Sequence, residues 1–130
     1  MPIRRQNCSA DFILTERFYQ NGTLISVPSR LELRYYTEER PDAVFLADRN
    51  GNTCNRCKVS NDGKSLSVYL SLSRNPIGRG RLLRSATVIT SNADFPDGIK
   101  KVTSPAPVDV ILWEGASDDS MEVVGTVETA

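Results

Sequence analysis

The chain has 130 residues, of which 25% are charged and 39% hydrophobic, a composition that fits one globular domain and excludes a disordered or membrane-embedded chain. Its 16 basic and 16 acidic residues cancel, so net charge gives no reason to expect binding to nucleic acid or to an anionic membrane. The chain has no histidine, which removes the most common general base and metal ligand.

The first part of the chain predicts a short arm followed by a strand and a turn. Residues 1–9 are polar and include Arg4 and Arg5. We expect them to form an N-terminal arm that is either flexible or docked on a neighbouring subunit. The range Ala10–Tyr19 predicts the first strand, and Asn21-Gly22 predicts a hairpin turn because both residues tolerate positive φ. The apolar face of this strand consists of Phe12, Leu14 and Phe18, with Glu16 as the exception.

The clearest strand is Ser65–Ser73, which we expect to lie at the centre of the core. Its aliphatic residues occupy every second position, so one face of the strand is entirely apolar. These residues are Leu66, Val68, Leu70 and Leu72. Further strands are predicted at residues 23–27, 30–37, 43–47, 54–60, 82–91 and 108–113. Residues 92–107 predict the longest irregular segment, and loops of that length are often functional.

These short strands with regular turn signals predict an all-β fold. We expect an antiparallel, immunoglobulin-like β-sandwich of seven to eight strands. The predicted parts are an N-terminal arm (1–9), a β-sandwich domain (10–115) and an acidic C-terminal tail or edge strand (116–130). Within that last part, Met121–Val124 is the candidate for the edge strand.

Several residues are candidates for contacts with other proteins. A cluster of four arginines fits a solvated loop or a protein contact better than a nucleic-acid contact, because no aromatic residues lie between them to stack on bases. The cluster consists of Arg74, Arg79, Arg81 and Arg84. We hypothesise that acidic residues after Glu114 pair with it in a neighbouring subunit. Trp113 fits core or rim packing, with an interface role as the alternative.

Edge strands and loops are the other expected contact points. Sandwiches leave edge strands whose free backbone groups can pair with a neighbour. We expect Ala10–Tyr19 and Val108–Trp113 to be such edges, and we expect residues 1–9 and 92–107 to contact other subunits. The interface candidates are therefore Arg4, Arg5, Arg79, Arg81, Phe95 and Trp113.

Candidate reactive groups are few. Cys54-x-x-Cys57 has metal-ligand spacing, but a structural zinc site needs four ligands and only Cys8 remains. Two buried or half-buried thiols near a turn are the main interpretation, with zinc and a redox pair as weaker alternatives. Asp94 and Asp97 could form a carboxylate pair, but their turn-rich surroundings favour capping of the backbone. We therefore expect no catalytic residues, no bound metal, no cofactor and no enzymatic activity.

Some motifs support a family resemblance. One set comprises the strand Asp11–Phe18 with its Asn-Gly turn, the strand–turn–strand unit Val59–Leu72 and the segment Gly80–Thr90. Their order resembles the N-terminal attachment domains of phage baseplate and fibre proteins. A second set comprises Asp94–Gly98, which reads D-F-P-D-G, followed by Val102–Pro105 and Val108–Trp113. It looks like a segment of short virion proteins from phages and prophages of Bacteroides-type bacteria, some of them labelled head fibre or tail proteins.

The resemblance covers about Ala10–Gly115 and implies a non-enzymatic structural protein of the virion. Such a protein would be a head fibre, a capsid decoration protein, or a fibre or tail attachment module. The implied partners are capsid, portal or tail proteins and further copies of the chain, trimers included, with no nucleic acid and no membrane. The first residues lack the apolar stretch of a secretion signal, so we expect synthesis in the host cytoplasm and a final location in the virion.

The alternative function is a carbohydrate-binding or adhesin-type β-sandwich module. Such a site needs exposed aromatic side chains lined up on one face or loop. The aromatic candidates are Tyr35, Tyr36, Tyr69 and Trp113.

Overall fold

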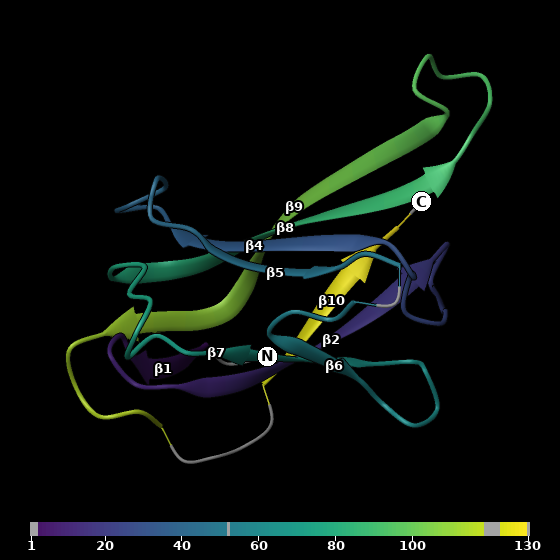
Figure 1. Ribbon diagram of the computed structural model, residues 1–130. Coiled ribbons are helices and arrows are strands. Elements are labelled where there is room, and N and C mark those ends of the chain that lie inside the picture. Colours follow the sequence, from purple (N-terminus) through teal and green to yellow (C-terminus); the bar gives the residue numbers. More distant parts are fainter. Residues whose placement is uncertain (1–2, 52, 119–122, 130) are drawn as a thin grey trace.

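The computed structural model describes residues 3–51, 53–118 and 123–129. Over these residues the chain is all-β without a helix, and its ten strands form two sheets packed face to face (Figure 1). The strands are β1 (Arg4–Asn7), β2 (Phe12–Gln20), β3 (Thr23–Leu24), β4 (Leu31–Thr37), β5 (Phe45–Arg49), β6 (Cys57–Val59), β7 (Leu66–Leu70), β8 (Gly80–Ser91), β9 (Ile99–Trp113) and β10 (Val123–Glu128). The prediction of an all-β fold with mainly antiparallel strands is confirmed.

The two sheets have the strand orders β1-β9-β8-β4-β5 and β10-β2-β7-β6, and β3 pairs with β2. Most neighbours are antiparallel, but the terminal strands pair in parallel, β1 with β9 and β10 with β2. The strand count exceeds the predicted seven to eight because both ends of the chain contribute a strand. β1 lies within the range 1–9, where an arm was predicted, and β10 lies at the edge of the second sheet within the range 116–130. Met121 and Glu122 lie outside the described residues.

The core between the sheets consists of alternating apolar positions. β7 contributes Leu66, Val68 and Leu70, each at most 1% exposed, and β4 contributes Leu31 and Leu33 from the opposite sheet. Burying one such side chain stabilises the fold by about 1.5–3 kcal/mol. Because β7 lies between β2 and β6, the predicted central strand is confirmed.

The first hairpin turn also forms as predicted. Asn21 and Gly22 have φ values of 52° and 78°, as a tight turn between β2 and β3 requires. β3 is shorter than the predicted strand 23–27 because the chain then turns to another loop. There the Val27 N–H donates to the Gly63 carbonyl at 2.8 Å.

The prediction of a long irregular segment at 92–107 is wrong. β8 and β9 are paired almost throughout, and only residues 92–98 connect them. Pro105 and Pro107 both lie within β9. Proline lacks an N–H and fits a strand where one side has no partner. Among the described residues, β1 pairs with that side of β9 only from Val110 onward.

Glu16, the exception on the apolar face of β2, is fully buried and paired with a charge from the other sheet. Arg84 of β8 donates to its carboxylate through Nε at 2.5 Å and Nη2 at 3.2 Å, and the Tyr35 hydroxyl donates to it at 3.0 Å. Burial, with the nearby Glu16 carboxylate, raises the pKa of Tyr35 well above its ordinary value. The inclusion of Arg84 in a solvent-facing arginine cluster is therefore wrong.

β10 closes over this buried cluster. Gly125 lies opposite Glu16 in the parallel pair, and a Cβ at that position would meet the Glu16 Oε1 atom at 1.7 Å. Arg84 Nη2 also donates to the Thr126 carbonyl at 2.9 Å. The C-terminal strand is thus fixed by a position where only glycine fits and by a hydrogen bond from the opposite sheet.

Candidate interaction surface

The β8–β9 hairpin extends beyond the rest of the molecule (Figure 1). β4 pairs with β8 only as far as Val88, and β1 pairs with β9 only from Val110 onward. Within the described ranges, the strand segments from Thr90 to Ser91 and from Ile99 to Lys100 pair only with each other. We call the range 90–100 the hairpin arm.

The tip of the hairpin arm is ordered by its own hydrogen bonds. The Asn92 N–H donates to the Gly98 carbonyl at 2.9 Å, and the Gly98 N–H donates to the Phe95 carbonyl at 2.9 Å. Asp97 Oδ1 accepts the Ile99 N–H at 3.3 Å, which is the turn role predicted for it. This loop holds Phe95 at the end of the arm with 43% of its surface exposed.

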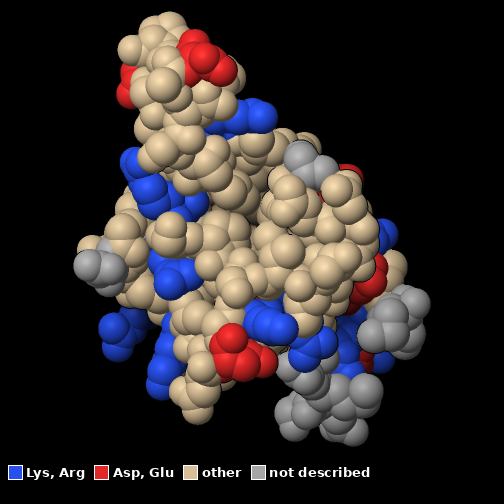
Figure 2. Space-filling view, turned by 90° about the vertical axis from the view of Figure 1, so that its right-hand side faces the viewer, with Lys and Arg blue, Asp and Glu red and all other residues tan. Residues whose placement is uncertain are grey.

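Acidic and basic side chains occupy different parts of the hairpin arm and of Lys101, the residue that follows it. Asp94 and Asp97 flank Phe95 at the tip, whereas Lys100 and Lys101 follow on β9. Figure 2 shows this projection at the top of the molecule, with acidic groups at its end and basic groups below. The tip therefore presents one aromatic ring between two carboxylates.

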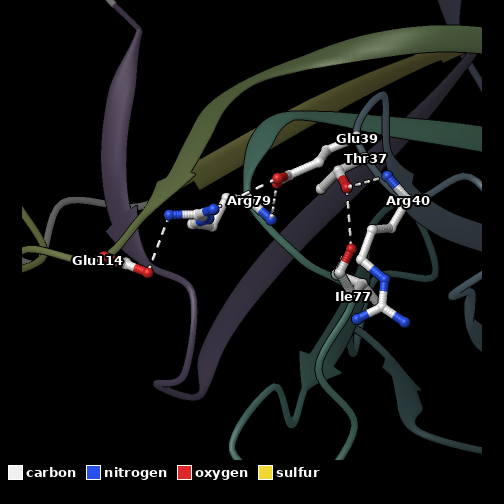
Figure 3. Close-up of polar contacts among 6 residues, drawn as sticks. All are labelled: Thr37, Glu39, Arg40, Ile77, Arg79 and Glu114. Carbon is white, nitrogen blue, oxygen red and sulfur yellow. Dashed lines mark hydrogen bonds and ion pairs between the residues drawn. The ribbon is translucent and has the colours of Figure 1, made fainter.

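The opposite end of the hairpin, which we call the root, carries Arg79 (Figure 3). Its Nη1 donates to Glu114 at 3.0 Å, its Nη2 donates to Glu39 at 3.4 Å, and its backbone N–H donates to Glu39 at 3.2 Å. The Thr37 hydroxyl donates to the Ile77 carbonyl at 2.9 Å and ties the same loop to β4. Arg79 is thus held between two carboxylates of its own chain.

An open hollow of about 710 Å³ lies at the root. Its charged lining consists of Glu38, Glu39, Arg79, Arg81 and Glu114. Arg81 also pairs with Asp109 at 3.2 Å. Carboxylates outnumber arginines on this lining, so the hollow is not a basic surface of the kind that binds a phosphate backbone.

Trp113 packs against the N-terminal strand at the same root. The Arg5 guanidinium carbon lies 4.9 Å from the centre of the Trp113 ring, and Arg5 pairs with Asp118 at 3.2 Å. The Arg5 backbone N–H donates to Asp118 at 2.8 Å and is the main cause that lowers the pKa of Asp118 below its usual 3.8. Trp113 itself is partly buried, and its Nε1 donates to the Ala116 carbonyl at 2.9 Å.

Five of the six predicted interface residues therefore fall into two places, and Arg4 lies apart from both. The root brings together Arg5, Arg79, Arg81 and Trp113, while the tip carries Phe95. Arg4 lies on β1, opposite Val110. Glu114 pairs with Arg79 and Asp118 pairs with Arg5, both within the same chain, and the pairing of acidic residues with arginines of a neighbouring subunit stays a prediction.

The two strands predicted to be open edges both have partners on each side. β2 lies between β10 and β7, and the end of β9 lies between β1 and β8. This prediction is wrong because the short terminal strands β1 and β10 cover those edges. In the described part of the chain the outermost strands of the two sheets are β1, β5, β6 and β10.

The cysteines are arranged as a pair and a separate thiol. Cys54 and Cys57 have their Sγ atoms 2.9 Å apart. Cys8 follows β1, where its N–H donates to the Trp113 carbonyl at 2.8 Å. Among the described residues, no group of three or more histidine, cysteine, aspartate or glutamate side chains is arranged to hold a metal ion.

The hairpin arm is the feature that sequence reasoning missed. A weak signal exists in residues 102–108, where half-buried or buried side chains alternate with exposed ones. The inward side chains are Val102, Ser104, Ala106 and Val108. Two of these four residues, Ser104 and Ala106, are small and only weakly apolar, and the two prolines interrupt the pattern, so the alternation is hard to distinguish from a loop.

Comparisons with models of protein families, with curated proteins and with solved structures found no match to this chain. In the ranges that the structure describes, no helix has the length and apolar character needed to cross a membrane.

Proposed function

We propose that this protein is a non-enzymatic structural subunit of a phage virion that acts through protein–protein contacts. In this proposal it is a head fibre, a capsid decoration protein, or a fibre or tail attachment module, as the sequence resemblance implies. The observation that carries the contact role is the projecting hairpin arm with Phe95 exposed at its tip.

The structure of the hairpin arm supports a docking role. Burying a phenylalanine side chain in a partner gains about 1.5–3 kcal/mol relative to leaving it in water. The loop that carries Phe95 is already fixed by three backbone hydrogen bonds, including the Phe95 N–H to the Asn92 carbonyl at 3.3 Å. A preformed loop loses less conformational entropy on binding than a flexible one does.

We propose a second copy of the same chain as the partner of the tip. On the outer face of β2 and β7, Ile13 and Tyr69 are 53% and 42% exposed and line a hollow of about 220 Å³. Its other walls include Phe12 and Leu70, so the lining is mainly apolar and of a size that suits an aromatic ring. Contacts between identical copies are also the commonest basis of soluble oligomers.

Photo-crosslinking tests this contact. The chain is made with p-benzoylphenylalanine at Phe95 and, as the control, at Leu46, which is 42% exposed on β5. We expect the Phe95 probe to give a product of twice the chain mass, with crosslinked peptides from β2 or β7, and the Leu46 probe to give none. Equal yields from the two positions, or only monomer at both, would contradict the contact.

Mass spectrometry of purified particles tests the virion assignment. We expect peptides of this chain to remain with the particles through a density gradient, at a constant ratio to the capsid protein. Loss of the peptides during purification would contradict the assignment.

We also propose the immunoglobulin-like class for the two-sheet fold. The neighbours β2-β7-β6 in one sheet and β9-β8-β4-β5 in the other follow the B-E-D and G-F-C-C′ orders of that class. An experimental structure that placed β4 or β8 in the other sheet would contradict it.

The carbohydrate-binding alternative has less support. Tyr35 is buried in the core, Tyr36 and Trp113 are partly buried, and Tyr69 stands beside apolar walls that offer a sugar few hydrogen-bond partners. Specific binding on a glycan array, lost in Tyr69→Ala, would favour this alternative.

A further inference from the structure

Cys54 and Cys57 lie where the chain crosses from one sheet to the other. β5 belongs to the first sheet and β6 to the second, and the connecting segment contains Cys54. The two Sγ atoms are 2.9 Å apart, and the Cys54 thiol also donates to the Cys57 carbonyl. Cys54 is exposed, whereas Cys57 is buried at the start of β6.

The residues between the two cysteines are anchored on both sides. The Asn55 N–H donates to the Asp48 carbonyl at 3.0 Å, and the Tyr69 N–H donates to the Arg56 carbonyl at 2.9 Å. Arg56 has a φ of 62°, and its guanidinium carbon lies 4.7 Å from the centre of the Phe45 ring. These contacts keep the two sulfur atoms facing each other across a short turn.

We propose that Cys54 and Cys57 form a thiol–disulfide exchange site that reacts with small-molecule disulfides such as oxidised glutathione. In the first step the Cys54 thiolate, having lost its proton to water, attacks one sulfur of the small disulfide. A mixed disulfide forms on Cys54, and one small thiolate leaves. In the second step Cys57 loses its proton and attacks the Cys54 sulfur, so the second small thiolate leaves. The two cysteines are oxidised to one disulfide, and one small disulfide is reduced to two thiols.

The environments of the two thiols set this order. Burial is the largest cause that raises the pKa of Cys57 to about 12, and the hydrogen bond with Cys54 adds to it. Cys57 therefore stays protonated near neutral pH and is a poor first nucleophile, since only the thiolate attacks. Cys54 is open to solvent and is the sulfur that a small disulfide can reach. Once Cys54 is part of the mixed disulfide, its Sγ atom is the sulfur that lies next to the Cys57 Sγ atom.

The product would link the ends of the turn between the two sheets. A disulfide stabilises a fold mainly by restricting the unfolded chain, and a short loop gives a small effect. We therefore expect oxidation to raise the melting temperature by a few degrees. Treatment of the oxidised protein with dithiothreitol should return the melting temperature to that of the reduced protein. This site is independent of the hairpin arm and of the proposed contact with a second copy.

Peptide mapping of the intact protein tests the proposal. The protein is incubated with oxidised glutathione, its remaining thiols are alkylated, and it is cut with trypsin, which cleaves after Arg56, between the two cysteines. We expect the peptides 50–56 and 57–58 to stay joined, with a mass two hydrogens below their sum, while Cys8 is alkylated. Alkylation of both Cys54 and Cys57, or a disulfide that includes Cys8, would overturn the proposal.

Three single variants separate the roles of the thiols. Cys57→Ser should stop at the mixed disulfide and carry one glutathione on Cys54. Cys54→Ser should leave Cys57 unmodified, and Cys8→Ser should behave as the unchanged protein. Rapid glutathione addition to Cys57 in the Cys54→Ser variant would refute the assigned order, and the absence of any adduct in Cys57→Ser would refute Cys54 as the attacking thiol.

Discussion

At the scale of single residues, Glu16 of one sheet is hydrogen-bonded to side chains of the other sheet. Its carboxylate receives hydrogen bonds from Arg84 and Tyr35 of the opposite sheet, and all three side chains are buried. Taking two charges out of water costs several kcal/mol per ion, and only close pairing offsets that cost. We therefore expect the pair to specify how the sheets face each other more than to add to their stability.

Double-mutant analysis tests this role of the charge pair. We expect Arg84→Met to lower the free energy of unfolding by about 3–5 kcal/mol, because Glu16 remains as an unpaired buried charge. Glu16→Leu alone should also be strongly destabilising, because Arg84 then remains as an unpaired buried charge. The double variant Glu16→Leu/Arg84→Met should lose much less than the sum of the two single variants, since neither charge remains and only the Tyr35 hydroxyl is left without its acceptor. Urea unfolding curves measure all three values. A double variant as unstable as the sum of the single ones would show that the two side chains are not coupled.

Gly125 provides a second residue-level prediction. We expect Gly125→Ala to destabilise the protein by about 1–3 kcal/mol or more, because the added methyl group collides with the Glu16 carboxylate. Thr126→Ala on the same strand is the control, with an expected change below about 1 kcal/mol. In a Glu16→Ala background the cost of Gly125→Ala should shrink markedly. Thermal unfolding of the four variants measures these changes. An unchanged cost of Gly125→Ala in the Glu16→Ala background would place the clash elsewhere.

Asp118 predicts how stability depends on pH. The Arg5 N–H lowers the pKa of Asp118 in the folded state, so folding favours the charged form. Its contribution is therefore present above the unfolded pKa, near 3.8, and is lost as the pH falls through the lower folded value. We expect Asp118→Asn to lower the melting temperature near neutral pH and to have a smaller effect below pH about 3. The exposed Asp42→Asn is the control, and an Asp118→Asn effect that grew on acidification would contradict the assignment.

Whole elements differ in how well the sequence predicts them. Strict alternation in Leu66–Leu72 and the Asn21-Gly22 turn were sufficient to place β7 and the first hairpin, because period-two burial and positive φ are local signals. The strands at the edges of the sheets could not be predicted in the same way. β1 has only four residues, and it pairs with a segment of β9 that lies more than a hundred positions later in the chain. The buried charge of Glu16 likewise depends on Arg84, which no local pattern connects to it.

At the scale of the element, we expect Pro105 and Pro107 to protect the side of β9 that has no strand partner there among the described residues. A strand with free N–H groups on one side can pair with another chain, and proline prevents this because it has no N–H. We expect the double variant Pro105→Val/Pro107→Val to keep the fold but to aggregate at lower protein concentration. Light scattering measures the threshold, with Thr103→Val on the same strand as the control for added apolar surface. An unchanged threshold would mean that the prolines have no protective role.

At the scale of the whole molecule, the hairpin separates two ends with different characters. At the root, Arg79 and Arg81 form ion pairs and Arg5 contacts Trp113, so these candidate interface residues already have partners within the chain. The tip offers Phe95 with 43% of its surface exposed, at the end of an arm whose two strands, among the described residues, pair only with each other. Of the six residues proposed from the sequence, Phe95 is therefore the one on which the proposed assembly depends most.

Sedimentation velocity over a range from micromolar to millimolar protein tests the proposed assembly most directly. We expect the unchanged protein to sediment as an oligomer, Phe95→Ser to shift to the mass of the single chain, and the matched exposed-residue control Leu46→Ser to remain oligomeric. A single-chain mass for the unchanged protein at every concentration, or an oligomer that Phe95→Ser leaves intact, would contradict the account.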